Sequence, residues 1–369
     1  MPVGEYIAAL LASEKLGRQV TCHRLFAPAE PHYAPTSLPW PAAVSRMLEQ
    51  RGIEGLYSHQ ALATDHIRAG HSIVAATPTA SGKSLIYNLP VLDRYLHDRD
   101  ARALYLFPLK ALAQDQLGAF NALVEGWPKE ARPTAALYDG DTTDHFRRKI
   151  RRDPPAVLIS NPEMLHLGIL PHHEQWAAFL AGLTHVVVDE AHTYRGVFGA
   201  HMAQVFRRLN RLAGRYGAKP VYVLCTATVG NPGELGAALT GTAYPAADEN
   251  IATENTAPGG TGSGTAHSTP DSIVSGTATA PVFQTVNPTA PPPVVIDKSG
   301  APQGPRHFVF LNPEQSPATA AIDLLKAALA RNLRTIVYCR SRRMTELISL
   351  WAGQSGSFAS RISAYRAGF

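Results

Sequence analysis

Short apolar runs of strand length alternate with longer amphipathic stretches through the first two thirds of the chain. Runs that are continuously apolar and partly β-branched are typical of strands buried on both faces of a parallel sheet. The alternation therefore predicts an α/β fold in which helices cover both faces of a parallel sheet. The predicted strands are 72–77, 103–107, 134–138, 156–160, 185–188 and 221–226, with helices that include 111–124 and 197–216.

The sequence pattern differs on both sides of this region. Residues 1–55 predict a helix, a Pro-rich crossing and a second helix at 42–51, which we interpret as an N-terminal helical extension. Residues 246–293 are rich in Thr, Gly, Ser, Ala and Pro, and few large apolar residues are available to offset the entropy of ordering them. This composition predicts a disordered insertion between residues 56–245 and 294–369.

The pattern resumes after the insertion with a strand at 307–311, a helix at 318–331, a strand at 334–339 and a helix at 342–351. This order predicts the start of a second α/β domain.

Composition narrows the class of protein. The chain has 369 residues, of which 45% are hydrophobic, so it is long enough for two domains. Its three cysteines lie far apart without metal-ligand spacing, which indicates a reduced, cytoplasmic protein. The N-terminus lacks a basic segment and a long apolar run, so no signal peptide or membrane anchor is expected. The net charge of +5 is a weak indication of an anionic partner.

The strand predicted at 72–77 runs into a phosphate-binding loop. Small residues allow backbone N–H groups to surround a phosphate, a lysine neutralises its charge, and a hydroxyl can bind Mg²⁺ at the start of a helix. Thr77 stands where the usual loop pattern begins with glycine. The loop residues are Thr79, Ala80, Ser81, Gly82, Lys83 and Ser84.

Two carboxylates follow the strand predicted at 185–188. Asp189 at the tip of a buried strand is placed to hold Mg²⁺, and Glu190 directly after it can polarise an attacking water. Farther upstream, the Gln60 amide offers one donor and one acceptor, which matches the edge of adenine. The alternative for Gln60 is an ordinary polar residue behind a helix cap at Ser58.

Several segments in this order resemble motifs of the superfamily 2 DEAD/DEAH-box helicases. They are SHQ (58–60), TPTASGKS (77–84), PLKALAQDQ (108–116), YDGDT (138–142), ISNPEML (159–165), DEAH (189–192) and TAT (226–228). HTYRGVFGAH, SRR and YRAGF resemble the bacterial DNA helicases of the mitomycin-repair-factor type, which are related to a RecQ-like eukaryotic group and carry a C-terminal zinc-binding domain. The resemblance covers residues 56–242 and 304–369.

The resemblance implies a RecA-like ATP-binding domain followed by an incomplete second RecA-like domain. It implies that Lys83, Ser84 and Asp189 hold ATP with Mg²⁺, that Glu190 activates water, and that Gln60 reads adenine. Residues that couple the nucleotide to nucleic acid are then His192, Thr226 and Thr228. Contacts to a nucleic-acid backbone are implied for Pro108, Lys110, Gly140, Asn161, Pro162, Glu163, Arg340 and Arg342.

Some of these residues, and several others, can also be interpreted without a specific function. Asn161-Pro162 is also a common pair at the start of a helix. The basic cluster 147–152 is a solvated helix face or an extension of the nucleic-acid track, and the cluster 207–215 is interpreted as a solvated helix face. His172 and His173 are interpreted as a surface pair.

The sequence thus predicts an ATP-hydrolysing DNA helicase or translocase core that acts in DNA repair and binds single-stranded DNA in preference to RNA. Alternatives are an RNA helicase of the same superfamily and a truncated ATP-binding and nucleic-acid-binding module that does not unwind. Since the family's motifs V and VI follow YRAG, the sequence reads as a fragment, and a separate chain or domain is expected to supply them.

Overall fold

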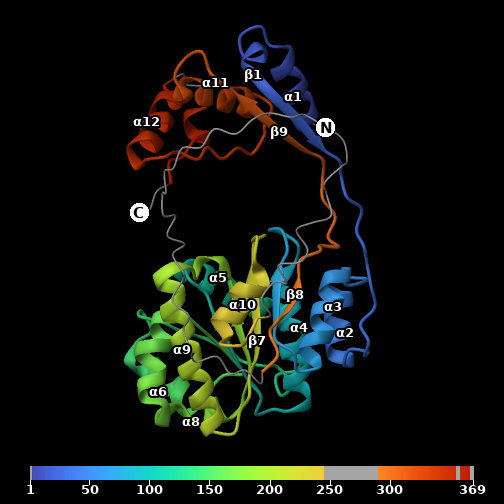
Figure 1. The fold of residues 1–369 in the computed structure, drawn as a ribbon, viewed down its shortest axis with the longest axis vertical. Coiled ribbons are helices and arrows are strands. Elements are labelled where there is room, and N and C mark those ends of the chain that lie inside the picture. Colours follow the sequence, from blue (N-terminus) through green and yellow to red (C-terminus); the bar gives the residue numbers. More distant parts are fainter. Residues whose placement is uncertain (1, 245–289, 355–357, 366–369) are drawn as a thin grey trace, which may run out of the picture. The chain divides into compact units, whose positions relative to one another are not determined.

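A parallel sheet of seven strands forms the centre of the larger of two units (Figure 1). The structure is a computed structural model, and it describes residues 2–244, 290–354 and 358–365. The larger unit comprises residues 31–301, and the smaller unit joins residues 1–30 to residues 302–369. Residues 246–289 of the predicted insertion lie outside the described residues.

The sheet has the order β4-β5-β3-β6-β7-β2-β8, and every neighbouring pair is parallel. Five of its strands follow the predicted runs closely, and β2 is shorter than its prediction. The strands are β2 (Ile73–Ala76), β3 (Arg102–Leu106), β4 (Ala135–Tyr138), β5 (Val157–Ser160), β6 (Leu183–Val188), β7 (Val221–Thr226) and β8 (Val294–Ile296).

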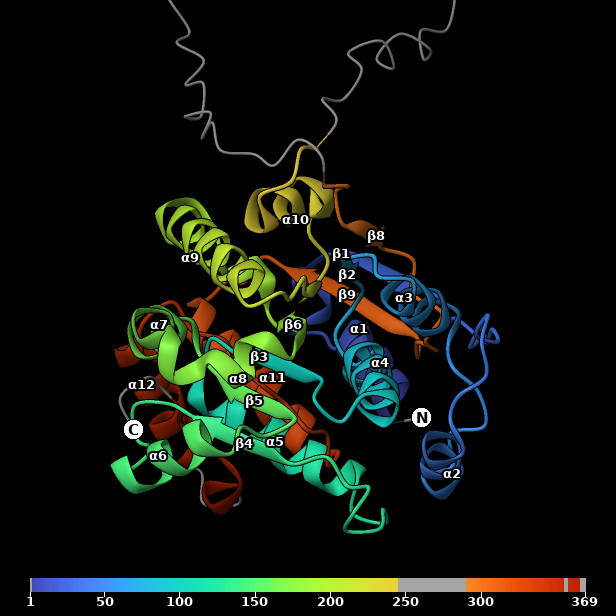
Figure 2. The same cartoon turned by 90° about the horizontal axis from the view of Figure 1, so that it is seen from below.

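Helices cover both faces of this sheet (Figure 2). Alternate strand residues point to opposite faces, so Ile73 and Ala75 pack in one core and Val74 packs in the other. On the first face lie α2 (Ala42–Gln50), α3 (Ser58–Arg68), α4 (Lys83–His97) and α5 (Lys110–Leu123). On the second lie α6 (Asp144–Arg152), the short α8 (Ala177–Ala181), α9 (Gly196–Arg215) and α10 (Pro232–Thr240). The predicted α/β fold is confirmed, as a RecA-like domain.

A two-stranded antiparallel ribbon belongs to the smaller unit. In it β1 (Val20–Phe26) pairs with β9 (Arg306–Leu311), so that Val20 lies opposite Leu311 and Phe26 opposite Arg306. The α-helices among the described residues of this unit are α1 (Pro2–Ala12), α11 (Pro317–Ala330) and α12 (Arg342–Gly353). The Tyr6 hydroxyl donates a hydrogen bond to the Leu324 carbonyl at 3.2 Å, which ties α1 to α11.

The division of the chain differs from the predicted boundaries at two places. Residues 1–55 do not form one extension, because β1 pairs with β9 across nearly 300 positions while α2 packs against α4. Residues 294–301 do not open the second domain, because β8 adds to the edge of the first sheet beside β2. Both differences arise from long-range strand pairing, which a local pattern does not register.

The strand predicted at 334–339 is also not formed. The segment is apolar and partly β-branched, but a strand needs a hydrogen-bonded neighbour, and none pairs with it in the described part of the chain. The Ile336 and Tyr338 side chains are 77% and 90% exposed. In the described ranges, no helix combines the length and apolar character needed to cross a membrane.

Candidate nucleotide site and nucleic-acid groove

Three neighbouring strands, β6, β7 and β2, end in segments that the sequence predicts to be functional. The phosphate-binding loop follows β2, the two carboxylates follow β6, and Thr226 is the last residue of β7. Because the strands are parallel, all three segments lie at the carboxyl edge of the sheet, where open α/β sheets bind ligands.

The loop after β2 has an unusual backbone conformation. Ala80 and Gly82 have φ angles of 62° and 76°, and Gly82 is the N-cap of α4. A Cβ atom at Gly82 would lie 2.5 Å from Nε2 of Gln60. Both the positive φ and this close approach require glycine here. Thr79 is exposed, Ser81 is buried, and Ser84 is half-buried in the first turn of α4.

The Lys83 ammonium lies against the loop's own backbone. Its Nζ donates to the carbonyls of Thr77 and Pro78, both at 2.9 Å. The Thr77 side chain is buried, and its hydroxyl lies 2.8 Å from Oγ of Ser81. The threonine that replaces the usual glycine therefore joins the two ends of the loop.

Gln60 and its neighbour His59 connect α3 to this loop. The Gln60 amide nitrogen donates to the Gly82 carbonyl at 3.0 Å, while its oxygen accepts from the Tyr57 N–H at 3.0 Å. Gln60 is only 2% exposed, so its amide serves the loop and the helix start in this structure.

His59 was not singled out by the sequence, although it is buried beside the loop. Its Nδ1 accepts from the Gly300 N–H at 3.1 Å, so its Nε2 carries the proton and donates to the Ser81 carbonyl at 3.0 Å. Burial lowers the pKa of His59, the hydrogen bond to the Ser81 carbonyl opposes that decrease, and the Lys83 charge adds to it. A neutral His59 thereby joins the loop to residue 300. Its position next to Gln60 is the one signal that the sequence offers.

The carboxylates after β6 lie in different surroundings. Burial raises the pKa of Asp189, whereas a hydrogen bond from the Glu190 N–H to Oδ1 at 3.0 Å and the nearby Lys83 charge oppose that rise. Glu190 has a φ of 50°, which is a costly conformation for a non-glycine residue. Such strain is typical of functional positions.

His192 connects this segment to the end of β7. Its Nδ1 lies 3.3 Å from a Glu190 carboxylate oxygen and 3.3 Å from the Thr226 hydroxyl. Thr226 is fully buried, and Thr228 two residues later is exposed. Of the three predicted coupling residues, His192 and Thr226 are therefore brought together, and His192 also contacts Glu190, the residue predicted to activate water.

Five of the residues predicted to contact nucleic acid line one groove of about 850 Å³. The groove lies beyond the carboxyl ends of β3 and β5, which are neighbours in the sheet. Asn161 accepts a hydrogen bond from the Met164 N–H at 2.8 Å and so caps the turn of α7 (Pro162–Met164). The five residues are Pro108, Lys110, Asn161, Pro162 and Glu163.

Gly140 lies beside this groove, in the loop after β4. A Cβ atom at Gly140 would lie 3.8 Å from Nζ of Lys110, and that ammonium pairs with Asp141 at 2.8 Å. Arg147 holds the loop from α6 by donating to the carbonyls of Thr142 and Asp139 at 2.8 and 3.0 Å. Arg147, which the sequence places in the basic cluster 147–152, is thus a residue that supports this loop.

Arg340 and Arg342 belong to the smaller unit and are exposed there. Arg342 is the first residue of α12, and Ser341 caps that helix by accepting from the Met344 N–H at 3.2 Å. The remaining predicted residues all belong to the larger unit.

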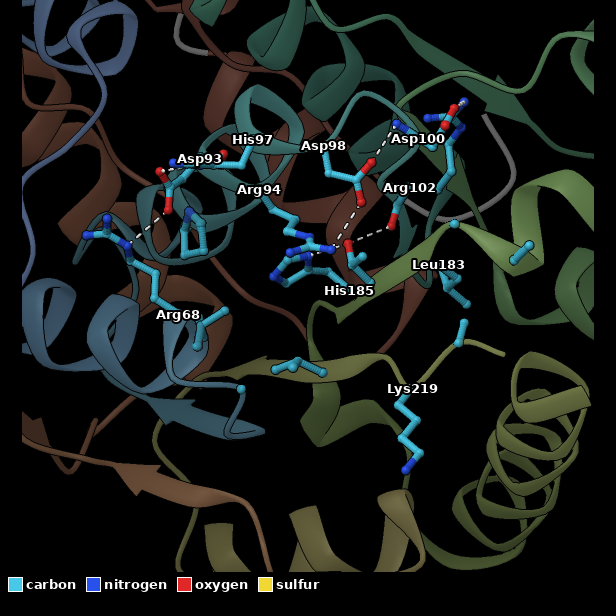
Figure 3. A pocket seen from close by; sticks show the side chains of 18 of the residues that line it. Arg68, Asp93, Arg94, His97, Asp98, Asp100, Arg102, Leu183, His185 and Lys219 are labelled. Atoms are coloured by element: carbon cyan, nitrogen blue, oxygen red, sulfur yellow. Dashed lines mark hydrogen bonds and ion pairs between the residues drawn. The ribbon is translucent and has the colours of Figure 1, made fainter. Parts of the chain in front are cut away.

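A second cavity, of about 870 Å³, lies at the opposite, amino edge of the same sheet (Figure 3). It is lined by the starts of β3, β6 and β7, so it is separate from the site described above. Its wall contains an ion pair between Arg68 and Asp93 at 3.0 Å and the buried His185.

Comparison with known proteins agrees with the motifs. Residues 57–235 match the model of the DEAD/DEAH box helicase family. The chain is 39% identical, over 332 residues, to the uncharacterized ATP-dependent helicase YprA of Bacillus subtilis, a match that covers 86% of this chain and 37% of that protein. It is 30% identical to the ATP-dependent helicase hrq1 of Schizosaccharomyces pombe, with coverage of 88% and 28%.

Among solved structures, the DUF1998 helicase MrfA bound to DNA is similar, with a TM-score of 0.78 and 34% identity over 100% of this chain and 46% of that one. MrfA bound to DNA and AMPPNP gives a TM-score of 0.77 at the same identity, with coverage of 98% and 43%. The chain thus spans less than half the length of these relatives. With its motifs assembled at one sheet edge, the chain belongs to the superfamily 2 DEAD/DEAH box helicases, a family that binds ATP.

Proposed function

We propose that this chain is the ATP-binding motor part of a DNA helicase or translocase. The observation that carries the proposal is the contact chain Glu190–His192–Thr226, because it links a carboxylate at the phosphate loop to the end of the neighbouring strand. In such an arrangement a change at the γ-phosphate alters contacts beyond the nucleotide site. A module that binds ATP without hydrolysing it, which is the alternative function, would not require these three residues to be in contact.

ATP fits the loop on chemical grounds. The left-handed turn at Gly82 and the N-terminus of the 15-residue α4 suit phosphate oxygens, and Lys83 supplies the positive charge. Ser84 and Asp189 would hold Mg²⁺, with phosphate oxygens and waters as its other ligands. The described residues contain no cluster of three or more His, Cys, Asp or Glu side chains that would hold a metal without the nucleotide.

In the proposed reaction, Lys83 and Glu190 have separate roles. Lys83 neutralises charge on the phosphates, and Glu190 orients the water that attacks the γ-phosphorus. For Gln60 to read adenine, its hydrogen bonds to Gly82 and Tyr57 would have to be exchanged or shared. We propose that Gln60 reads adenine in this way.

The smaller unit is proposed to be the start of a second RecA-like domain. Its β9 and α11 form one strand–helix pair, and α12 follows the apolar segment 334–339, for which the sequence predicts a second strand. Arg340 and Arg342 would contact the nucleic-acid backbone from that domain.

DNA is the proposed partner because the MrfA structures contain DNA. We further propose that this DNA helicase acts in DNA repair. The alternative is an RNA helicase of the same superfamily. The test is titration of a fluorescent ATP analogue with Mg²⁺ in the presence of single-stranded DNA or RNA of equal length. If nucleic-acid binding and nucleotide binding are coupled, the nucleic acid must strengthen or weaken binding of the ATP analogue. A response to RNA alone would reject DNA, and no response to either would reject the motor.

A further inference from the structure

The helix α9 is unusually basic for an element that packs against the sheet. Its 20 residues include four arginines and no acidic residue. Two of the arginines, Arg208 and Arg211, line the groove of about 850 Å³ beside Lys110 and Asn161. A third, Arg207, faces a different groove, between α9 and α10.

Arg208 and Arg211 form no ion pair with a carboxylate in the part of the chain that the structure describes. They are three positions apart on a helix, where side chains are neighbours and like charges repel. The acidic side chain that lines the same groove is the exposed Glu163. The groove therefore has an excess of positive charge that an anion would relieve.

The floor of the groove has a different character. Phe198 also lines the groove and is 49% exposed, whereas Met202 and Val205 line it with only 3% and 7% exposure, so Phe198 offers an open apolar face there. A surface of this kind suits the face of an unstacked base, and flanking arginines suit phosphates. A duplex offers phosphates but keeps its base faces stacked, and an acidic protein surface would leave the apolar floor uncovered.

We propose that this face of α9 is the second wall of a single-stranded DNA groove, in which Arg208 and Arg211 bind phosphates and a base lies against Phe198. This inference rests on the proposed function, and it extends the track from the strand-end loops onto a helix. It also replaces the interpretation of this cluster as a purely solvated helix face.

The test is fluorescence-anisotropy binding of single-stranded DNA over a range of salt concentrations. We compare the unchanged chain with R208A/R211A and with the charge-matched control R46A/R215A, whose arginines are exposed and do not line the groove. Each lost phosphate contact lowers the slope of log K against log salt by about 0.7. R208A/R211A should therefore lose about 1.4 from the slope and bind roughly tenfold more weakly, while the control stays near the unchanged chain and R208K/R211K recovers most of the slope.

The outcomes separate this inference from the proposed function. If R208A/R211A binds like R46A/R215A while the unchanged chain binds DNA, the second wall is wrong and the motor proposal stands. If the unchanged chain does not bind DNA at low salt, the motor proposal fails as well. Equal affinity for intact and abasic oligonucleotides would reject the base contact on the apolar floor. Unchanged binding of the ATP analogue by R208A/R211A checks that the larger unit is folded.

Discussion

At the scale of single residues, the site depends on backbone conformations that most side chains avoid. Ala80, Gly82 and Glu190 all have positive φ angles, and they lie in the two segments that surround the candidate nucleotide site. Residues held in this way persist only where their surroundings fix them. For the loop, these contacts include hydrogen bonds from Gln60 and Lys83 and a hydrogen bond between the hydroxyls of Thr77 and Ser81.

Lys83→Ala and Glu190→Gln should affect nucleotide binding differently. Lys83 interacts with charge that is already present on bound ATP, whereas Glu190 acts on water in the transition state. We expect K83A to weaken binding of a fluorescent ATP analogue by roughly 10- to 100-fold, in line with a charged hydrogen bond. E190Q should stay within about twofold of the unchanged chain. The exposed K149A serves as the charge control, and equal loss in K83A and E190Q would contradict the assigned roles.

Gly82→Ala should weaken nucleotide binding in addition to the loss of stability that backbone strain causes. Gly82 and Gly217 have φ angles of 76° and 85°, but a Cβ at Gly82 meets Gln60 at 2.5 Å whereas one at Gly217 meets nothing within 4 Å. G217A should therefore cost only the strain of a left-handed residue, about 1–2 kcal/mol. We expect G82A to lose analogue binding in addition, since Gln60 and the loop must shift. Normal analogue binding by G82A would show that the loop tolerates the shift.

At the scale of elements, the amino edge of the sheet contains buried ionisable groups that affect stability more than chemistry (Figure 3). Arg68 at the end of α3 and Asp93 on α4 form an ion pair in which both side chains are nearly buried, at 11% and 12% exposure. His185 on β6 accepts or donates a hydrogen bond with Thr184 at 2.8 Å. The ion pair fastens α3 to α4, whereas the hydrogen bond of His185 lies within β6.

Asp93→Asn should destabilise the larger unit by about 2 kcal/mol, because it leaves the Arg68 charge nearly buried without a carboxylate. The matched control is Asp98→Asn, which breaks the exposed pair Arg94–Asp98 at 3.1 Å and should cost about 0.5 kcal/mol or less. Urea unfolding of both variants measures the difference. Equal midpoints would mean that burial does not strengthen the Arg68–Asp93 pair.

Acid should destabilise the larger unit through His185. Burial, with the nearby Arg94 charge, lowers the pKa of His185 to about 4. The unfolded chain binds this proton below its ordinary pKa of about 6.5, so stability falls as the pH decreases from that value toward 4. Between pH 7 and 5 the loss from His185 is about 2 kcal/mol.

His185→Asn should remove this part of the pH dependence in urea unfolding at pH 7 and 5. The lowered pKa of His59 acts in the same direction and remains in the variant, while the raised pKa of Asp189 acts in the opposite direction. An unchanged pH dependence in H185N would show that His185 titrates normally in the folded chain.

At the scale of the whole molecule, each unit is assembled from segments that are far apart in the sequence. The smaller unit combines residues 1–30 with residues 302–369, and β8 joins the larger unit after the insertion. The nucleotide site and the groove both lie in residues 31–301. Nucleotide binding should therefore not depend on the pairing of β1 with β9.

Deletion of residues 2–30 tests this separation. Within the described ranges β1 is the strand that pairs with β9, so its loss leaves the Arg306–Leu311 amides without their partners. We expect these amides to lose hydrogen-exchange protection while the affinity for the ATP analogue stays within about twofold, since the site's contacts are untouched. A large loss of affinity would show that the first 30 residues support the site directly.

The sequence by itself determined the local features of this protein. Apolar runs located six strands of the parallel sheet, and the small residues around Gly82 located the phosphate loop, because backbone preferences and burial act over a few positions. The order of strands and helices was sufficient to predict the side of the sheet on which Lys83, Asp189 and Thr226 meet.

Only the tertiary structure decided the features that depend on distant partners. The pairing of β1 with β9 and of β8 with β2 joins residues up to about 290 positions apart. The segment 334–339 has the pattern of a strand but lacks a neighbour, and Arg208 and Arg211 acquire a groove only through the loops that fold beside them. A local pattern records how much a residue favours burial or extension, whereas pairing, register and a shared cavity are properties of two or more segments together.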